Sequence, residues 1–209
     1  MKKIILTLAL LFPIAACADL THQRASQLQA SPVVVTAKAK DQNPCTKNPI
    51  YILGDSHGVG IALNDKCYIN WAKSGRNTRA KELKEQVRLI PAGANVAISI
   101  GHNDWWKSAE TFANIEQLLS ALAQKGARVA YIPPPCTFHP TGDRTERIRA
   151  YMTRWEEGDV RFFDLMQYEK DCLTMHNSPD AIHYRPETYA KARKGLVKFF
   201  KAWEDEIYE

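Results

Sequence analysis

Short apolar segments alternate with amphipathic segments from residue 50 to near the end of the chain, and this alternation strongly restricts the possible folds. The apolar segments are typical of buried strands, and most of them end at or shortly before a glycine or proline. The predicted strands are residues 50–53, 67–71, 95–100, 127–132 and 160–165. Apolar residues at helical spacing predict helices at 57–64, 78–90, 109–125, 143–157 and 186–204.

Strands that are apolar along their whole length are buried on both faces, which is typical of a parallel sheet covered by helices. We therefore predict an α/β fold, a three-layer sandwich around a flavodoxin-like five-stranded parallel sheet. In such folds, functional residues gather at the carboxyl ends of the strands.

The first residues have the pattern of an export signal. Lys2 and Lys3 precede an apolar run over residues 4–14, which is shorter than the roughly 20 residues of a membrane span. The small residues before Cys17 resemble the lipobox of bacterial lipoproteins, in which the cysteine receives diacylglycerol and becomes the mature N-terminus. The alternative is an ordinary secretory signal with an incidental cysteine.

We accordingly expect a signal peptide at 1–16, a lipidated N-terminus and flexible tether at 17–48, and a folded domain at 49–209. Acyl chains on Cys17 would anchor the domain to a bacterial membrane, where it would face the periplasm or the exterior as part of the cell envelope.

The chain has five cysteines, and four remain if Cys17 is lipidated. Four cysteines in an exported domain suggest two disulfides, for which three pairings exist. Cys45 and Cys67 precede the first two predicted strands, whereas Cys136 and Cys172 follow the fourth and fifth. Because each pair adjoins neighbouring strands, we predict the disulfides Cys45–Cys67 and Cys136–Cys172. The cysteine spacing indicates no metal site.

The formal charge of +5 falls to +3 when Lys2 and Lys3 are removed with the signal peptide. Basic residues are scattered, and the arginines between 144 and 154 fit a solvated helix face. We therefore expect no nucleic-acid partner, and we expect a monomer.

Gly54-Asp55-Ser56-His57 directly follows the first predicted strand. A serine on a tight turn before a helix is exposed, but it needs a general base to become a nucleophile. The alternative role of Ser56 is that of a helix N-cap.

A candidate base lies far along the chain, where Asp180 precedes His183 by three residues in the loop before the last helix. An aspartate at this spacing can orient the imidazole and stabilise its charged form. Asp180 could instead be an N-terminal cap, and His183 could be one of several surface histidines. The other histidines are His22, His57, His102, His139 and His176.

Two more strand ends could provide hydrogen-bond donors for a negatively charged oxygen. Ser74-Gly75-Arg76-Asn77 follows the second strand and Gly101-His102-Asn103-Asp104 follows the third. We expect an oxyanion hole formed by the backbone N–H groups of Ser56 and Gly75 and by the Asn103 amide.

These four segments resemble, in order and spacing, the motif blocks of the SGNH (GDSL-like) hydrolases, over residues 50 to about 195. The resemblance implies that Ser56 is the nucleophile, that Asp180 and His183 complete the triad, and that Gly75 and Asn103 serve the oxyanion hole. His57 departs from the common pattern, which has leucine there; a GDSH version also occurs, including among polysaccharide O-acyl transferases and esterases.

The expected activity is ester hydrolysis through an acyl-enzyme, with no metal and no organic cofactor. The expected substrate carries a short acyl group, such as acetyl, on an envelope or surface glycan. The alternatives are a glycan O-acyltransferase, a lysophospholipase or thioesterase, and a lipoprotein that binds glycan or protein on the same fold without turnover. Trp105, Trp106 and His139 are candidate substrate contacts, although the two indoles could equally pack in the core.

Overall fold

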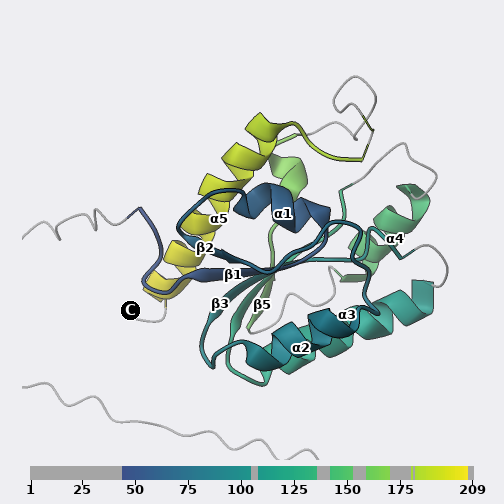
Figure 1. Cartoon of the computed structure of the whole chain (residues 1–209), viewed down its shortest axis with the longest axis horizontal. Helices are drawn as coiled ribbons and strands as arrows, with labels where there is room; N and C mark the ends of the chain where they lie inside the picture. The colour runs from purple at the N-terminus through teal and green to yellow at the C-terminus, as the bar shows by residue number, and fades with distance from the viewer. Residues whose placement is uncertain are drawn as a thin grey trace, which may run out of the picture. The chain divides into compact units, whose positions relative to one another are not determined.

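Five parallel strands form one sheet in the order β2-β1-β3-β4-β5 (Figure 1). This order is that of the flavodoxin-like sheet, so the predicted fold class is confirmed. The strands are β1 Ile50–Gly54, β2 Tyr68–Asn70, β3 Asn95–Ser99, β4 Arg128–Ile132 and β5 Val160–Phe162.

The computed structural model describes residues 44–104, 108–135, 142–152, 159–169, 180 and 182–206. All described residues belong to one compact unit, residues 41–209. Cys17, Cys136 and Cys172, and with them the predicted lipidation and second disulfide, lie outside the described residues.

The helices overlap the predicted segments, and their described ends differ from the predicted ones by at most three residues; residues 153–157 of the fourth predicted helix lie outside the described residues. They are α1 Ser56–Ala62, α2 Lys81–Leu89, α3 Ser108–Ala123, α4 Gly142–Met152 and α5 Pro186–Glu206. The fifth strand is shorter than predicted, because Asp164 caps a 3-10 helix, η2 Leu165–Gln167, by accepting a hydrogen bond from the Met166 N–H at 2.9 Å. The chain therefore turns where the apolar pattern alone predicted continued strand.

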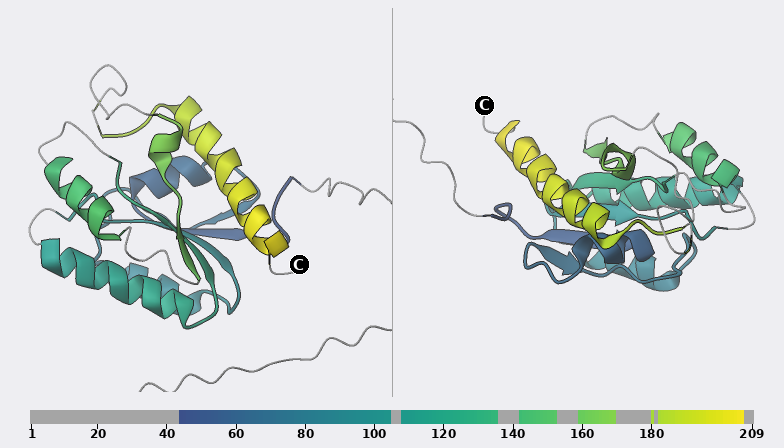
Figure 2. Two further views of the ribbon diagram at one scale, coloured as in Figure 1. Left: turned by 180° about the vertical axis from the view of Figure 1, so that it is seen from behind. Right: turned by 90° about the horizontal axis from the view of Figure 1, so that it is seen from above.

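Each face of the sheet carries its own core. Along β3, Ala97 packs on the face covered by α1 and α5, whereas Val96 and Ile98 pack on the face covered by α2, α3 and α4. Figure 1 shows α1 and α5 on one side of the strands with α2 and α3 on the other, and Figure 2 shows α4 beside α3. All five residues of β3 are buried, as the uniformly apolar strands predicted.

Residues 44–48, which the sequence assigned to the tether, pack against the domain. Cys45 forms a disulfide with Cys67, which confirms that predicted pair. Thr46 is buried, and the Lys47 N–H donates to the Glu204 carboxylate at 3.3 Å. The disulfide and this hydrogen bond hold the segment beside the amino ends of β1 and β2.

We predict that removal of this disulfide lowers the free energy of unfolding by about 3 kcal/mol, because it closes a loop with a sequence separation of 22 residues. Chemical denaturation of Cys45→Ala, Cys67→Ala and the double variant measures the effect. The double variant should be no less stable than either single one, since either change removes the same bond. Additive losses would show that the two cysteines act through packing alone.

Candidate active site

The turn after β1 depends on a glycine. Gly54 has φ +108°, and a Cβ atom at this position would lie 1.7 Å from the Ser99 carbonyl oxygen. A residue with a side chain would force β1 and β3 apart at this point. The absence of a Cβ therefore allows the chain to turn directly into α1 beside the end of β3.

Asp55 is the N-cap of α1. Its buried carboxylate accepts hydrogen bonds from the His57 N–H at 3.0 Å and from the Ser99 hydroxyl at 3.1 Å. The Asp55 N–H donates to the Ser99 carbonyl at 2.8 Å. Because Asp55 caps the helix, the alternative role of Ser56 as the cap is wrong, and the Ser56 hydroxyl is available for another contact.

Ser56, His183 and Asp180 form a chain of hydrogen bonds. Ser56 Oγ lies 2.7 Å from His183 Nε2, and His183 Nδ1 lies 2.6 Å from Asp180 Oδ2. Asp180 also accepts hydrogen bonds from the N–H groups of Ile182 and His183 at 3.0 and 2.9 Å. Asp180 thus both closes the local turn and holds the imidazole, so its capping role and its orienting role coexist.

These contacts define the hydrogen positions that suit a general base. An ionised carboxylate can only accept, so Nδ1 of His183 carries the proton that faces Asp180. In the neutral ring, the Nε2 lone pair then faces the Ser56 hydroxyl and can take its proton. The His183 side chain is 38% exposed and that of Asp180 49%, so the pair stands at a solvent-accessible edge.

Hydrogen bonds connect the loop after β2 to the turn after β3, beside the Ser56–His183–Asp180 hydrogen-bond chain. Asn103 Nδ2 donates to the Arg76 carbonyl at 3.0 Å, and buried Asp104 accepts from the Thr78 N–H at 3.1 Å. Gly75 is exposed with φ +73°, and the Lys73 N–H donates to the Gly54 carbonyl at 2.9 Å. The Asn103 amide retains a second N–H, and its role with Gly75 in an oxyanion hole stays a prediction.

His57 is fully buried behind the hydrogen-bond chain. Its Nδ1 lies 2.7 Å from the Tyr189 hydroxyl, which also accepts the Tyr184 N–H at 3.4 Å. The Tyr189 hydroxyl therefore has its proton free to donate to His57 Nδ1. Burial, with His102 and His183 nearby, holds the pKa of His57 well below its usual range, so the ring is neutral. Its centroid lies 5.4 Å from that of His183.

Trp105, Trp106 and His139, the candidate substrate contacts, lie outside the described residues, as does His176. His102 is buried and its ring meets that of His57 edge to face, with centroids 5.4 Å apart. Within the ranges that the structure describes, no three His, Cys, Asp or Glu side chains are grouped to hold a metal ion.

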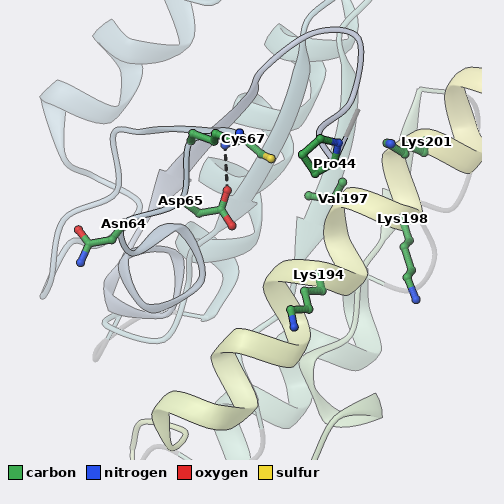
Figure 3. Close-up of a pocket in the computed structure, with 9 residues that line it drawn as sticks. Pro44, Asn64, Asp65, Cys67, Lys194, Val197, Lys198 and Lys201 are labelled. Carbon is green, nitrogen blue, oxygen red and sulfur yellow. Dashed lines mark hydrogen bonds between the residues drawn. The ribbon is translucent and has the colours of Figure 1, made fainter. Parts of the chain in front are cut away.

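A hollow of about 600 Å³ lies at the amino ends of the strands, away from Ser56. Cys67 and Val197 contribute to its lining, together with Lys194, Lys198 and Lys201 of α5 (Figure 3). In Figure 3, the three ammonium groups lie well apart and do not converge on one point. The lining of this hollow, which we call the lysine hollow, includes none of the three residues of the hydrogen-bond chain.

The sequence analysis missed several residues that position the site. Asp55 precedes a helix and could have been identified as its cap from that place alone. Asp104 lies within a motif used for Asn103, but its contact with Thr78 spans 26 residues and has no local signature. The same applies to Tyr189, which meets His57 across 132 residues.

Comparisons with solved structures identify the fold, whereas no family model and no curated protein matches the chain. A GDSL-like lipase from Bacteroides thetaiotaomicron has a TM-score of 0.54 and 18% identity, over 75% of this chain and 89% of that one. A psychrotrophic esterase from Pseudoalteromonas sp. has a TM-score of 0.54 and 19% identity, over 76% and 99%. The C-terminal catalytic domain of peptidoglycan O-acetyltransferase A from Streptococcus pneumoniae has a TM-score of 0.51 and 16% identity, over 73% and 91%.

All three similarities cover most of both chains, at identities that establish the fold alone. The chain therefore has the fold of the SGNH, or GDSL-like, hydrolases, as the motif resemblance implied.

The buried Asp55 carboxyl group should make the stability of the folded protein depend on pH. Burial raises its pKa from 3.8 to about 7, despite the hydrogen bonds from His57 and Ser99. Since the folded state holds the proton more tightly than the unfolded state, the stability contribution of Asp55 falls as pH rises from about 4 to about 7. The loss is at most roughly 4 kcal/mol.

Asp55→Asn removes this titration and therefore does not share the parent's loss of stability. The stability of the variant relative to that of the parent should increase over the same pH interval and level off above it. Denaturation at a series of pH values measures the difference. Asp205→Asn, at an exposed position on α5, should follow the parent curve. Parallel curves for the parent and Asp55→Asn would contradict the assignment.

Proposed function

We propose that the protein is a serine esterase that acts through an acyl-enzyme. The observation that carries this proposal is the hydrogen-bond chain from Ser56 through His183 to Asp180, at the carboxyl edge of the sheet. The fold shared with a lipase, an esterase and an O-acetyltransferase supports acyl-ester chemistry as its class.

In the proposed reaction, Ser56 Oγ attacks the ester carbonyl while His183 Nε2 removes its proton. Asp180 stabilises the imidazolium that forms, and the N–H groups of Ser56 and Gly75 with the Asn103 amide hold the oxyanion. His183 then gives its proton to the leaving alcohol. Water, activated by the same imidazole, attacks the acyl-enzyme and releases the acid.

The substrate that we propose is a short acyl ester, such as acetyl, on an envelope or surface glycan. The similarity to the catalytic domain of a peptidoglycan O-acetyltransferase favours this chemistry and also makes acyl transfer the second candidate. Transfer uses the same acyl-enzyme with a sugar hydroxyl in place of water. Release of acetate, as opposed to appearance of acetylated acceptor sugar, separates the two reactions.

Substitution of the triad tests the proposal. The purified domain should react with a fluorophosphonate probe and hydrolyse p-nitrophenyl acetate, whereas Ser56→Ala and His183→Ala should lose labelling and roughly a thousandfold or more in kcat/KM. Ser120→Ala, a serine of α3 away from the site, is the matched control and should behave as the parent. A folded parent protein that neither labels nor turns over would favour a binding role on this fold.

We also propose that Cys17 is lipidated and anchors the protein to a bacterial membrane, with the domain facing the periplasm or the exterior. The support is the export-signal pattern that ends at Cys17. In the part of the chain that the structure describes, no helix is long and apolar enough to cross a membrane.

Metabolic labelling with a clickable palmitate analogue in a bacterial host tests the anchor. The full chain should incorporate the label and fractionate with membranes, and Cys17→Ala should do neither, because the acyl chains provide the membrane affinity. Equal labelling of the two proteins would contradict Cys17 as the acceptor.

A further inference from the structure

A second hollow, of about 330 Å³, lies beside the loop that contains Gly75. We call it the cationic hollow, because three of the residues that line it are Lys73, Arg76 and Arg79. Its lining also includes Gly75 and one acidic residue, Glu82. This volume is at the small end of ligand pockets and suits one sugar-sized group.

The cationic hollow adjoins the proposed reaction centre. Gly75, the predicted oxyanion residue, forms part of its lining. The Lys73 N–H donates to the carbonyl of Gly54, two residues before Ser56. The same loop packs on α1, since a Cβ built on Gly58 would lie 2.9 Å from the Cβ of Ala72. A substrate that binds with its ester at Ser56 would therefore place either its acyl group or its alcohol part beside the cationic hollow.

The guanidinium of Arg76 is the most informative charge. Arg76 is 8% exposed, and its Nη1 donates at 2.8 Å to the Trp71 carbonyl and at 2.8 Å to Gln86 Oε1, both neutral acceptors. Within the described part of the chain no carboxylate lies within ion-pair distance of Arg76. Burial lowers the pKa of Arg76, and the nearby charge of Glu82 offsets only part of this effect. A buried cation usually pairs with an anion, because desolvation of an uncompensated charge is costly.

The other charges leave the hollow net positive. Arg79 reaches Glu110 at 3.8 Å in an exposed pair, which solvent screens strongly. The Lys73 side chain is exposed, and Glu82 supplies the one carboxylate of the lining. A planar guanidinium and an ammonium around one small hollow are complementary to a carboxylate.

We propose that the cationic hollow binds the carboxylate of an acidic sugar, so that the esterase prefers an O-acylated sugar acid to a neutral acylated sugar. The inference rests on the proposed function and specifies its substrate class. Lys73 and Arg79 act here as specificity-determining residues, whereas Ser56 and His183 carry out the chemistry.

Matched acetyl esters test the preference by kcat/KM: O-acetylated glucuronate, O-acetylated glucose and O-acetylated glucose phosphate. The glucuronate ester should exceed the glucose ester by about tenfold at low salt, as charge-assisted hydrogen bonds allow, and the ratio should fall as salt is added. Lys73→Ala and Arg79→Gln should reduce this ratio towards one.

Lys198→Ala is the matched control, because that lysine lies at the lysine hollow at the other end of the strands. It should keep the full preference. Equal kcat/KM values for acetylated glucuronate and acetylated glucose would overturn the proposal. A preference for acetylated glucose phosphate over acetylated glucuronate would also overturn it.

A binding measurement separates this inference from the esterase proposal. Ser56→Ala should bind glucuronate more tightly than glucose in an NMR titration, and Lys73→Ala in the same background should lose that difference. This readout requires no turnover, so selective binding would support the hollow even if no ester is hydrolysed. Equal binding of the two sugars would overturn the inference even in an active esterase.

Discussion

The close approach of β1 to β3 at Gly54 and Ser99 is the constraint on which the site depends. Gly54 has no Cβ to separate the strands, and Ser99 uses both its carbonyl and its hydroxyl to hold Asp55. Asp55 in turn caps α1, which fixes the first helical residue, Ser56. The position of the proposed nucleophile therefore follows from backbone packing in the fully buried centre of the sheet.

The two halves of the triad are assembled in different ways. The Asp180 carboxylate accepts hydrogen bonds from the backbone N–H groups of Ile182 and His183 and contacts the His183 ring, so a few neighbouring residues form the base and its orienting group. Ser56 meets His183 across 127 residues of sequence, because both lie at the carboxyl edge of the parallel sheet. A local motif thus prepares the base, and the fold supplies the nucleophile.

This division explains what could be predicted from the sequence. The strands, the sheet type and the Cys45–Cys67 disulfide follow from apolar patterning and from which segments neighbour each other. The early end of β5 depends on one capping side chain, Asp164, within an otherwise apolar run. The neutral acceptors around Arg76 and the Tyr189 contact of His57 could not be predicted, because burial and partners across the fold leave no periodic signal.

The charges around Ser56 are distributed unequally, and this matters for the proposed proton transfer. Behind the serine, burial keeps His57 neutral and raises the pKa of Asp55 to about 7, so the negative charge of Asp55 is reduced near neutral pH. The Tyr189 hydroxyl occupies His57 Nδ1, which leaves His183 as the imidazole that faces Ser56 Oγ. At the solvent-accessible edge, Asp180 is hydrogen-bonded to His183, and the buried Arg76 lies in the loop that holds Gly75. Negative charge that develops on a bound ester would therefore lie toward the loop that contains Gly75 and Arg76, and positive charge on His183 would lie toward Asp180. This arrangement separates the two charges in the direction that the reaction requires.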